Sequence, residues 1–254
     1  HSEKAEKGVT KLIATWVSDS YDKNTALISI GGGKPKDIWS TEITDQYVPV
    51  NARKIHVKET SGLVAGDVIR IERAVNGAWA HDLRMDSITD APGILSENQW
   101  AENGKILPAY KGVSQERRIK EVLEDAIILE EPIVDPLNMK YGVSHIYKID
   151  CSARVCNSGV ENMMLMSVFD KKSTSTNTAY DTVYKFYDDE SHAQVGIKIL
   201  NAEDVWARRV TTYHIDVAAT VMSGTCRASL QDINCLDPVS GTGGERRYSF
   251  IHWK

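Results

Sequence analysis

Short alternating runs of apolar and polar residues fill the second half of the chain. Three of them, at residues 155–169, 196–214 and 219–236, share one layout when they are aligned. The aligned positions are Val160 with Val205 and Ala228, Asn162 with Ala207 and Leu230, and Leu165 with Val210 and Ile233. The second and third runs lie 23 residues apart, and a polar loop from Asp170 to Ser191 lengthens the step between the first and second. A repeat of this length predicts the coils of a parallel β-solenoid, which bury their apolar edges by stacking on each other.

The start of the chain contains a similar pattern. Residues 10–17 and 25–30 form two runs rich in β-branched and apolar residues, and a polar turn cluster separates them. Three glycines at positions 31–33 then end the pattern, because glycine weakens a strand and permits a sharp turn. Residues 143–150 alternate again, which predicts that the solenoid resumes there.

Residues 39–136 have a different pattern of apolar and polar residues. Residues 54–58 and 68–72 predict two antiparallel strands joined by a turn at 62–67, in which Asp67 bonds its own backbone. Residues 115–136 favour a strand, a turn at Glu124 and Asp125 and a second strand, although the first part has helical propensity. We therefore expect β-helix coils at residues 1–38 and 137–254, and an inserted β-rich, barrel-like domain at 39–136.

Composition and charge exclude some classes of function. Of the 254 residues, 42% are hydrophobic and 26% are charged, which is typical of a folded globular protein. The formal net charge of −5 argues against a nucleic-acid-binding protein, which usually carries a basic excess. No apolar run reaches the roughly 20 residues that a membrane span requires. We therefore expect neither nucleic acid nor a membrane span.

The four cysteines are too few to predict a disulfide framework, and no pair has C-x-x-C spacing. We expect them to be small side chains inside the solenoid, and a bridge between Cys226 and Cys235 is the alternative. The polar start without an initiating Met, and the strand-like run at 247–254 without a polar cap, suggest a fragment. We expect further β-helix coils, from the same protein or from a partner chain, to cover the last one.

The repeated coils carry a resemblance to a known superfamily. Together with segments 157–165 and 201–211 and the module at 62–67, they resemble the right-handed parallel β-helix superfamily of pectate lyases and related polysaccharide-acting enzymes. Residues 188–197 and 236–250 are similar to segments of secreted bacterial β-helix proteins with such an insertion. The resemblance covers about half the chain. It implies an all-β, right-handed parallel β-helix, a polysaccharide partner, and a secreted, periplasmic or cell-surface location. It implies no particular reaction, since the superfamily includes lyases, hydrolases, epimerases and non-catalytic tailspike-like proteins.

Acidic residues close the long loop that precedes residue 196. Asp188, Asp189 and Glu190, with His192 beside them, could hold Ca²⁺ or supply an acid and a base. A solvated acidic turn is the alternative. No calcium motif of the lyases and no carboxylate motif of the hydrolases matches these residues one by one.

His214 is the candidate base. Asp216 follows two residues later, so an extended strand would place both side chains on one face. A neutral imidazole near pH 7 could accept a proton, although a hydrogen-bonded, stacked histidine is an equal alternative. Arg208 and Arg209 precede Gln231 and Asp232 by 23 residues, which predicts an ion pair between neighbouring coils.

Arginine and aromatic residues are candidates for substrate contacts. Arg246, Arg247 and Tyr248 follow a glycine-rich loop at 241–244, and an Arg fork binds carboxylates such as those of an acidic polysaccharide. Trp79 could stack on a sugar ring beside His81, Asp82 and Asp86, or it could lie in a partly buried loop.

These groups predict a polysaccharide lyase or a glycoside hydrolase. A lyase would use His214, Arg209 and Arg247, with Asp216 beside them and Ca²⁺ as the expected metal at the three acidic positions. A hydrolase needs two carboxylates about 5–9.5 Å apart, chosen from Asp188, Asp189, Glu190 and Asp216. The substrate-binding candidates are Trp79, Arg208, Arg246, Tyr248 and His192. The alternative from another class is a non-catalytic carbohydrate-binding or adhesive β-solenoid.

Overall fold

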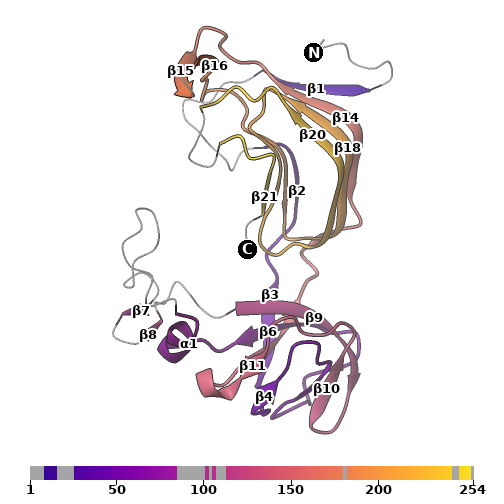
Figure 1. The fold of residues 1–254 in the computed structure, drawn as a ribbon. Helices are drawn as coiled ribbons and strands as arrows, with labels where there is room; N and C mark the ends of the chain where they lie inside the picture. Colours follow the sequence, from indigo (N-terminus) through magenta and orange to yellow (C-terminus); the bar gives the residue numbers. More distant parts are fainter. Residues whose placement is uncertain are drawn as a thin grey trace. The chain divides into compact units, whose positions relative to one another are not determined.

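The protein divides into two compact units in a computed structural model (Figure 1). Unit 1 consists of residues 1–35 and 152–254, and unit 2 consists of residues 36–151. The structure describes residues 9–15, 26–84, 101–102, 105–106, 113–179, 182–241 and 246–252. The predicted fold class is confirmed: an all-β right-handed parallel β-helix interrupted by a small β-rich domain. No helix within these ranges has the length and apolarity that crossing a membrane requires.

Unit 1 is the β-helix, and its strands stack in two parallel sheets (Figure 1). The first sheet contains, in spatial order, β1 (Thr10–Ala14), β14 (Gly159–Ser167), β18 (Ala202–Tyr213) and β20 (Cys226–Leu236). The short strand β13 (Val155–Cys156) continues β14 along β18. The second sheet contains β2 (Ala26–Gly31), β17 (Val195–Leu200), β19 (Val217–Val221) and β21 (Phe250–His252). Each coil thus contributes to both sheets, and the early coil predicted before the glycines is confirmed by β1 and β2.

The pairing of the coils confirms one predicted register and corrects another. Between β18 and β20, Val205 pairs with Ala228 and Val210 with Ile233, as the 23-residue repeat predicts. Between β14 and β18, Leu165 pairs with Thr212 and not with Val210. A shift of two residues keeps every side chain on the same face of the sheet. The apolar pattern therefore could not reveal it.

Left-handed residues bend the long strands of unit 1 at matching positions. Asn162, Arg209 and Asp232 lie in register, with φ of 56°, 50° and 54°. A second column contains Asn157, Asp204 and Arg227, with φ of 51°, 54° and 50°. Asn and Asp tolerate this conformation better than most residues do. The bends direct each coil around a core that is built from fully buried side chains such as those of Leu165, Ile197, Ile199, Ala207 and Val210.

Unit 2 contains residues 143–150, so the prediction that they resume the solenoid is wrong. Strand β12 (His145–Asp150) pairs antiparallel with β3 (Lys36–Glu42) and β6 (Val68–Arg73). Strands of a parallel coil and of an antiparallel sheet share the same period of two, so alternation alone does not separate them. The boundaries between the units along the chain accordingly fall between residues 35 and 36 and between residues 151 and 152. The sequence had placed them between 38 and 39 and between 136 and 137.

The main sheet of unit 2 has the order β3-β12-β6-β9-β10-β5. Strands β9 (Val113–Val122) and β10 (Ala126–Leu129) form the predicted strand–turn–strand. The prediction that residues 54–58 and 68–72 pair with each other is wrong, because β5 (Lys54–His56) pairs with β10, and β6 lies between β12 and β9. As predicted, Asp67 bonds its own turn, with Oδ2 accepting from the Val64 N–H at 2.8 Å.

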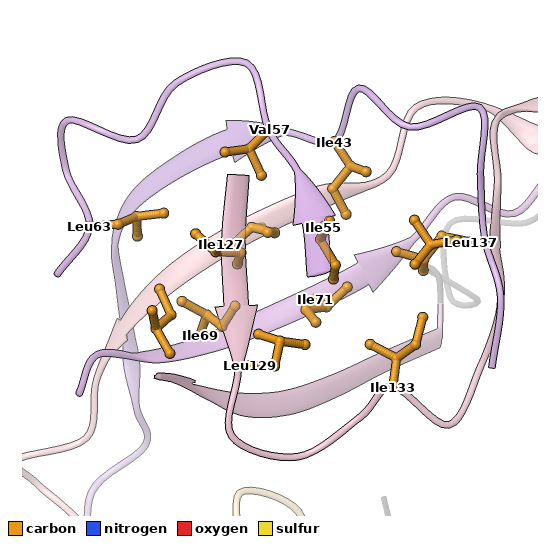
Figure 2. Packing of buried hydrophobic residues seen from close by; sticks show 13 residues of the cluster. Ile43, Ile55, Val57, Leu63, Ile69, Ile71, Ile127, Leu129, Ile133 and Leu137 are labelled. Carbon is orange, nitrogen blue, oxygen red and sulfur yellow. The ribbon is translucent and has the colours of Figure 1, made fainter. Parts of the chain in front are cut away.

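Alternating isoleucines form the core of unit 2 (Figure 2). Ile69 and Ile71 on β6 are fully buried together with Ile55, Ile127 and Ile146 on other strands. Because successive side chains of a strand point to opposite faces, the alternation puts all of them on one side of the sheet. Full burial of each such side chain stabilises the fold by about 1.5–3 kcal/mol.

Short elements complete the two units. Unit 2 also contains β4 (Tyr47–Val48), α1 (Gly77–Asp82), β7 (Ala101–Glu102), β8 (Lys105–Ile106), β11 (Leu137–Asn138) and the 3₁₀ turn η2 (Met139–Tyr141). Unit 1 carries a hairpin of β15 (Thr174–Ala179) and β16 (Thr182–Tyr187) where the sequence suggested only a polar loop. The cysteines are thiols, so the Cys226–Cys235 bridge does not form, and Cys156 is exposed rather than inside the solenoid.

Candidate functional site

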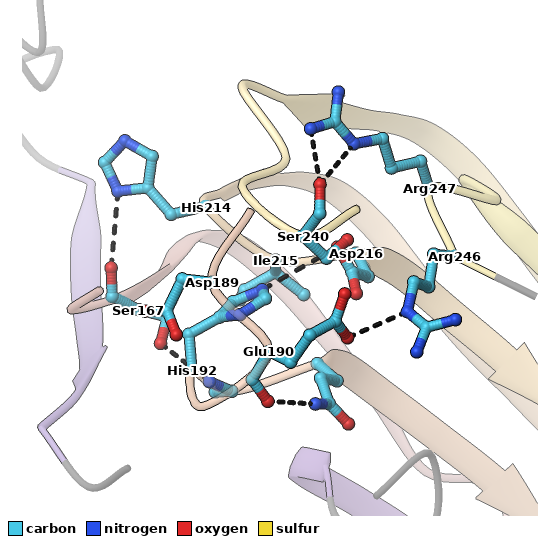
Figure 3. Close-up of polar contacts among 12 residues, drawn as sticks. Ser167, Asp189, Glu190, His192, His214, Ile215, Asp216, Ser240, Arg246 and Arg247 are labelled. Carbon is cyan, nitrogen blue, oxygen red and sulfur yellow. Dashed lines mark hydrogen bonds and ion pairs between the residues drawn. The ribbon is translucent and has the colours of Figure 1, made fainter. Parts of the chain in front are cut away.

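Loops from three successive coils meet along the edge of the β-helix where the strands of the first sheet end. They follow β16, β18 and β20, and they carry most of the site residues that the sequence predicted (Figure 3). The backbone N–H of Asp189 donates to the carbonyl of Val239 at 2.8 Å, and the Gly241 N–H donates to Glu190 Oε1 at 3.0 Å. These bonds fasten the loop after β20 to the loop after β16.

A pocket of about 310 Å³ opens among these loops. Aromatic rings of Phe169, Phe186 and Tyr187 line it, together with the cationic side chains of Lys171 and Arg247. His214 and Asp237 complete its polar lining, and Asp237 is the only carboxylate among the described residues around it. Apolar rings with a few charged groups are typical of a ligand site, and here the charge is mostly positive.

His214 is held at the pocket by its backbone and by its ring. Its φ is 60°, and its ring lies 4.7 Å from that of Phe169, between centroids. The ring Nδ1 lies 3.3 Å from the carbonyl oxygen of Ser167. A proton on Nδ1 would be donated to that carbonyl, which leaves Nε2 as an acceptor. The arrangement is therefore suited to a base whose Nε2 takes a proton.

Asp216 does not share a face with His214, contrary to the prediction. Strand β18 ends at Tyr213, and the left-handed conformation of His214 breaks the alternation. Asp216 is fully buried and points toward Ser240 and His192, whereas His214 points away toward Ser167 (Figure 3). The two predicted partners thus belong to different environments.

The buried cluster of Asp216, Ser240 and His192 lies next to the pocket-lining loops. All three side chains are fully buried. Ser240 Oγ donates to Asp216 Oδ1, and the His192 Nε2 lies 3.7 Å from the same oxygen. The serine hydroxyl is thus bound to the carboxylate and not to the histidine, so this is not the arrangement of a Ser-His-Asp nucleophile.

Arg247, which the sequence proposed as a catalytic residue, lies at the pocket wall. Its Nε donates to the carbonyl oxygen of Ser240 at 2.9 Å, and its Nη2 donates to that oxygen and to the Tyr187 carbonyl at 3.1 Å. The guanidinium also stacks on Phe186, with 5.3 Å between its carbon and the ring centroid. Hydrogen bonds to two backbone carbonyls therefore fix the Arg247 side chain, and its positive charge lies at the pocket.

The predicted acidic group is divided among separate partners. Asp188 accepts from Ser175 Oγ, and Glu190 Oε2 accepts from Arg246 Nε at 2.8 Å. Asp189 accepts from the backbone N–H groups of Asp170 and Ser191, at 2.6 and 2.8 Å, and from the Ser191 hydroxyl. Burial works to raise the pKa of Asp189, but the hydrogen bonds from Ser191 and Asp170 outweigh it and hold that pKa below its ordinary value.

This arrangement does not fit a calcium site. Within the described parts of the chain, no three His, Cys, Asp or Glu side chains are grouped so that they could hold a metal ion. Ca²⁺ needs six to eight oxygen ligands. The oxygens of the three carboxylates instead accept hydrogen bonds from neighbouring groups. Calcium stays a prediction that these contacts do not support.

Other predicted residues lie outside the pocket lining. Arg208 and Arg209 form ion pairs with Glu161 of the preceding coil, at 3.8 and 3.1 Å, and not with Gln231 or Asp232 of the next coil. Tyr248 is exposed. Trp79 belongs to unit 2, where it lies in α1 and the Arg73 guanidinium stacks on its ring at 5.0 Å. Asp86, expected beside it, lies outside the described residues.

The pocket also contains residues that the sequence did not point to, namely Phe169, Lys171, Phe186, Tyr187 and Asp237. Three of these, Lys171, Phe186 and Tyr187, belong to the segment 170–191 that was taken as a polar loop. Its Thr, Tyr and Phe residues are typical of strands, and that enrichment was the signal for the hairpin.

Comparison with known proteins gives no family. No family model matches the chain, and no curated protein matches it. Among solved structures, the tailspike gp61 of Pseudomonas phage phi297 is 10% identical over 91% of this chain and 35% of that one, with a TM-score of 0.39. The tailspike gp49 of Pseudomonas phage LKA1 is 11% identical over 82% and 30%, with a TM-score of 0.36.

A third similar structure is the gp54 tailspike of Acinetobacter baumannii bacteriophage AP22, solved in complex with A. baumannii capsular saccharide. It is 8% identical over 91% of this chain and 39% of that one, with a TM-score of 0.31. The chain thus spans between 30% and 39% of the length of these proteins. Likenesses this weak leave the function of this protein to be argued from its own side chains.

Proposed function

We propose that unit 1 binds an acidic polysaccharide at the pocket beside His214 and cleaves it as a lyase. The observation that carries the proposal is the composition of the pocket: three aromatic rings, two cationic side chains and a histidine, with Asp237 as the only carboxylate among its described lining residues. Aromatic faces suit sugar rings, and Lys171 and Arg247 suit a uronate carboxylate. A protein with this substrate would act outside the cytoplasm, at a cell surface or after secretion.

His214 would act as the base in this reaction. Its Nε2 would take the proton from the carbon next to the uronate carboxylate, and Arg247 would stabilise the negative charge that develops on that carboxylate. The electrons of the broken C–H bond form a carbon–carbon double bond, and the C–O bond to the neighbouring sugar breaks. Water protonates the leaving oxygen. The reaction needs no oxidant, reductant or metal.

The carboxylates favour this reaction over hydrolysis. A hydrolase needs an acid and a second carboxylate that both face the substrate. Asp188, Asp189 and Glu190 accept hydrogen bonds from neighbouring groups, and Asp216 is fully buried with Ser240. None of these four is among the described residues that line the pocket.

The test is a panel of acidic and neutral polysaccharides incubated with the full chain. Polygalacturonate, alginate and hyaluronate represent uronate polymers, and dextran represents neutral ones. We expect the absorbance of unsaturated uronate ends to appear with at least one acidic polymer and not with dextran. New reducing ends without that absorbance would instead make the protein a hydrolase, and retention without any cleavage would make it a binding protein.

Variants connect the result to the pocket. We expect His214→Gln to lose about 10²–10⁴-fold in rate, the usual contribution of a general base, while the affinity for the polymer stays. Lys171→Ala should raise KM, and Lys172→Ala is its matched control, since Lys172 is also an exposed lysine but is not among the lining residues. Equal rates for His214→Gln and the native protein would exclude His214 as the base.

A further inference from the structure

The contacts of Arg247 extend from the pocket into the buried cluster. Arg247 is fixed by two N–H groups that both bind the carbonyl oxygen of Ser240. The side chain of the same Ser240 donates to Asp216, and both are fully buried. A buried carboxylate is therefore linked through one residue to the guanidinium at the pocket wall (Figure 3).

Stability alone does not explain why Asp216 and Ser240 are buried together. The oxygens of a buried carboxyl group are expected to take part in hydrogen bonds, because burying a polar group without partners is costly. Asp216 Oδ2 has no hydrogen-bond partner among the described residues, and neither ring nitrogen of His192 has one. The Ser240 hydroxyl is thus the one hydrogen-bond donor to the Asp216 carboxylate among the described residues. Apolar residues of similar size would fill this space at lower cost.

We propose that Asp216 and Ser240 are positioning residues that hold Arg247 in place to bind the carboxylate of the substrate. The inference rests on the proposed function, because it assigns a purpose to Arg247 at the pocket. Asp216 fixes the Ser240 side chain, and this fixes the direction of the Ser240 carbonyl. That carbonyl occupies Nε and Nη2 of Arg247 and so orients the plane of its guanidinium. Nη1, which makes none of the hydrogen bonds found among the described residues, then faces the ligand.

Two other contacts hold the loop around Ser240 independently of the Ser240 hydroxyl. The backbone groups of both neighbours of Ser240 are hydrogen-bonded, since the Val239 carbonyl accepts from the Asp189 N–H and the Gly241 N–H donates to the Glu190 side chain. These bonds keep the loop attached when the Ser240 hydroxyl is removed. Ser240→Ala should therefore change the aim of Arg247 without releasing the loop.

The first measurement follows Arg247 itself and needs no ligand. In protein with ¹⁵N-labelled arginine, the Arg247 Nε–H is identified by its loss in Arg247→Lys, and its exchange with water is measured. We expect the exchange to become about three- to tenfold faster in Ser240→Ala, the effect of one lost hydrogen bond. Asp216→Asn, which keeps an acceptor for the Ser240 hydroxyl, should behave as the native protein does.

Ser191→Ala is the matched control. It removes a serine hydroxyl from another buried carboxylate, Asp189, which keeps its backbone donors from Ser191 and Asp170. The Ser191 side chain has no contact with Arg247 among the described residues, so the exchange of the Arg247 Nε–H should not change. An equal effect of Ser191→Ala and Ser240→Ala would mean general loosening and would overturn the proposal.

The second measurement is the affinity for a uronate oligosaccharide and for the same oligosaccharide with its carboxylates reduced to alcohols. We expect Ser240→Ala to weaken binding of the acidic form about three- to tenfold and to leave the neutral form unchanged. In the Arg247→Ala background, Ser240→Ala should have no further effect, because its action passes through Arg247. Additive losses would overturn the positioning role.

The two measurements separate this inference from the proposed function. If the native protein bound no uronate oligosaccharide, the proposed function would fail, and the assignment of Arg247 to a substrate carboxylate would fail with it. The exchange measurement would still decide whether Asp216 and Ser240 hold Arg247. If binding occurs but Arg247 exchange ignores Ser240→Ala, only the positioning role is wrong.

Discussion

The left-handed column of Asn162, Arg209 and Asp232 gives the most direct test of the β-helix. Asp232 is exposed, and no hydrogen bond of its side chain occurs among the described residues, so its replacement changes mainly the backbone preference. At φ of 54°, a residue that is not Gly, Asn or Asp costs about 1–2 kcal/mol. Valine cannot adopt this conformation easily because its Cβ is branched. We therefore expect Asp232→Val to destabilise the outer coil by about 1–2 kcal/mol.

Hydrogen exchange with mass spectrometry measures this effect on peptides from β20. A loss of that size should accelerate exchange there by about 5- to 30-fold. Gln231→Val is the matched control, because Gln231 is the exposed neighbour on the same strand with ordinary extended backbone, and valine is favoured in strands. Asp232→Gly should be close to neutral, because glycine relieves the strain but loses more conformational entropy on folding. Equal exchange in Asp232→Val and Gln231→Val would refute the left-handed bend.

Three further outcomes can be checked. Ile197→Ala and Ile69→Ala should each cost about 2–5 kcal/mol in the free energy of unfolding, measured by exchange in their own unit and not in the other, because each side chain is fully buried in a separate core. Asp189→Asn should flatten the loss of stability in acid. The lowered pKa of Asp189 means that its ionised form stabilises the fold above the ordinary carboxyl pKa of about 4, and that this contribution is lost as the pH falls through the folded value. Gly32→Ala should destabilise unit 1, since a Cβ there would lie 2.5 Å from the Ala153 carbonyl oxygen and the Val155 nitrogen, and circular dichroism melting measures the loss.

Sequence patterns located the solenoid because its repeat is local and regular. The spacing of 23 residues between β18 and β20 is uninterrupted, and the predicted pairs there are the observed ones. The step from β14 to β18 contains the hairpin of β15 and β16, and the register slipped by two residues. Such a slip preserves the inward and outward faces, so the apolar pattern fits both registers equally well.

The candidate site was predicted less completely, for a physical reason. His214 and Arg247 were proposed because their chemistry is recognisable in isolation, and the structure places both at the pocket. The buried partner of Arg247 is a carbonyl, and every residue carries one, so composition cannot reveal it. Arg209 was proposed near the chemistry, but it is not among the described residues that line the pocket. Its ion pair was predicted with the next coil, and it forms with Glu161 of the preceding coil instead, because the repeat does not reveal which neighbouring coil a side chain faces. Phe186 and Tyr187 were missed because the hairpin that carries them was taken as a loop.

The position of unit 2 within the chain has a consequence for synthesis. The chain leaves the β-helix after β2, forms unit 2, and returns to the β-helix at β13. The Gly33 N–H donates to the Ala153 carbonyl at 2.7 Å, so the residues that precede and follow unit 2 are hydrogen-bonded to each other. Thr10 of β1 pairs with Met163, which a ribosome adds only after the whole of unit 2. The strands of unit 2 pair with one another, so they can assemble as soon as they emerge. The strands of the first coil, β1 and β2, therefore stay unpaired until β14 and β17 of the second coil have been synthesised.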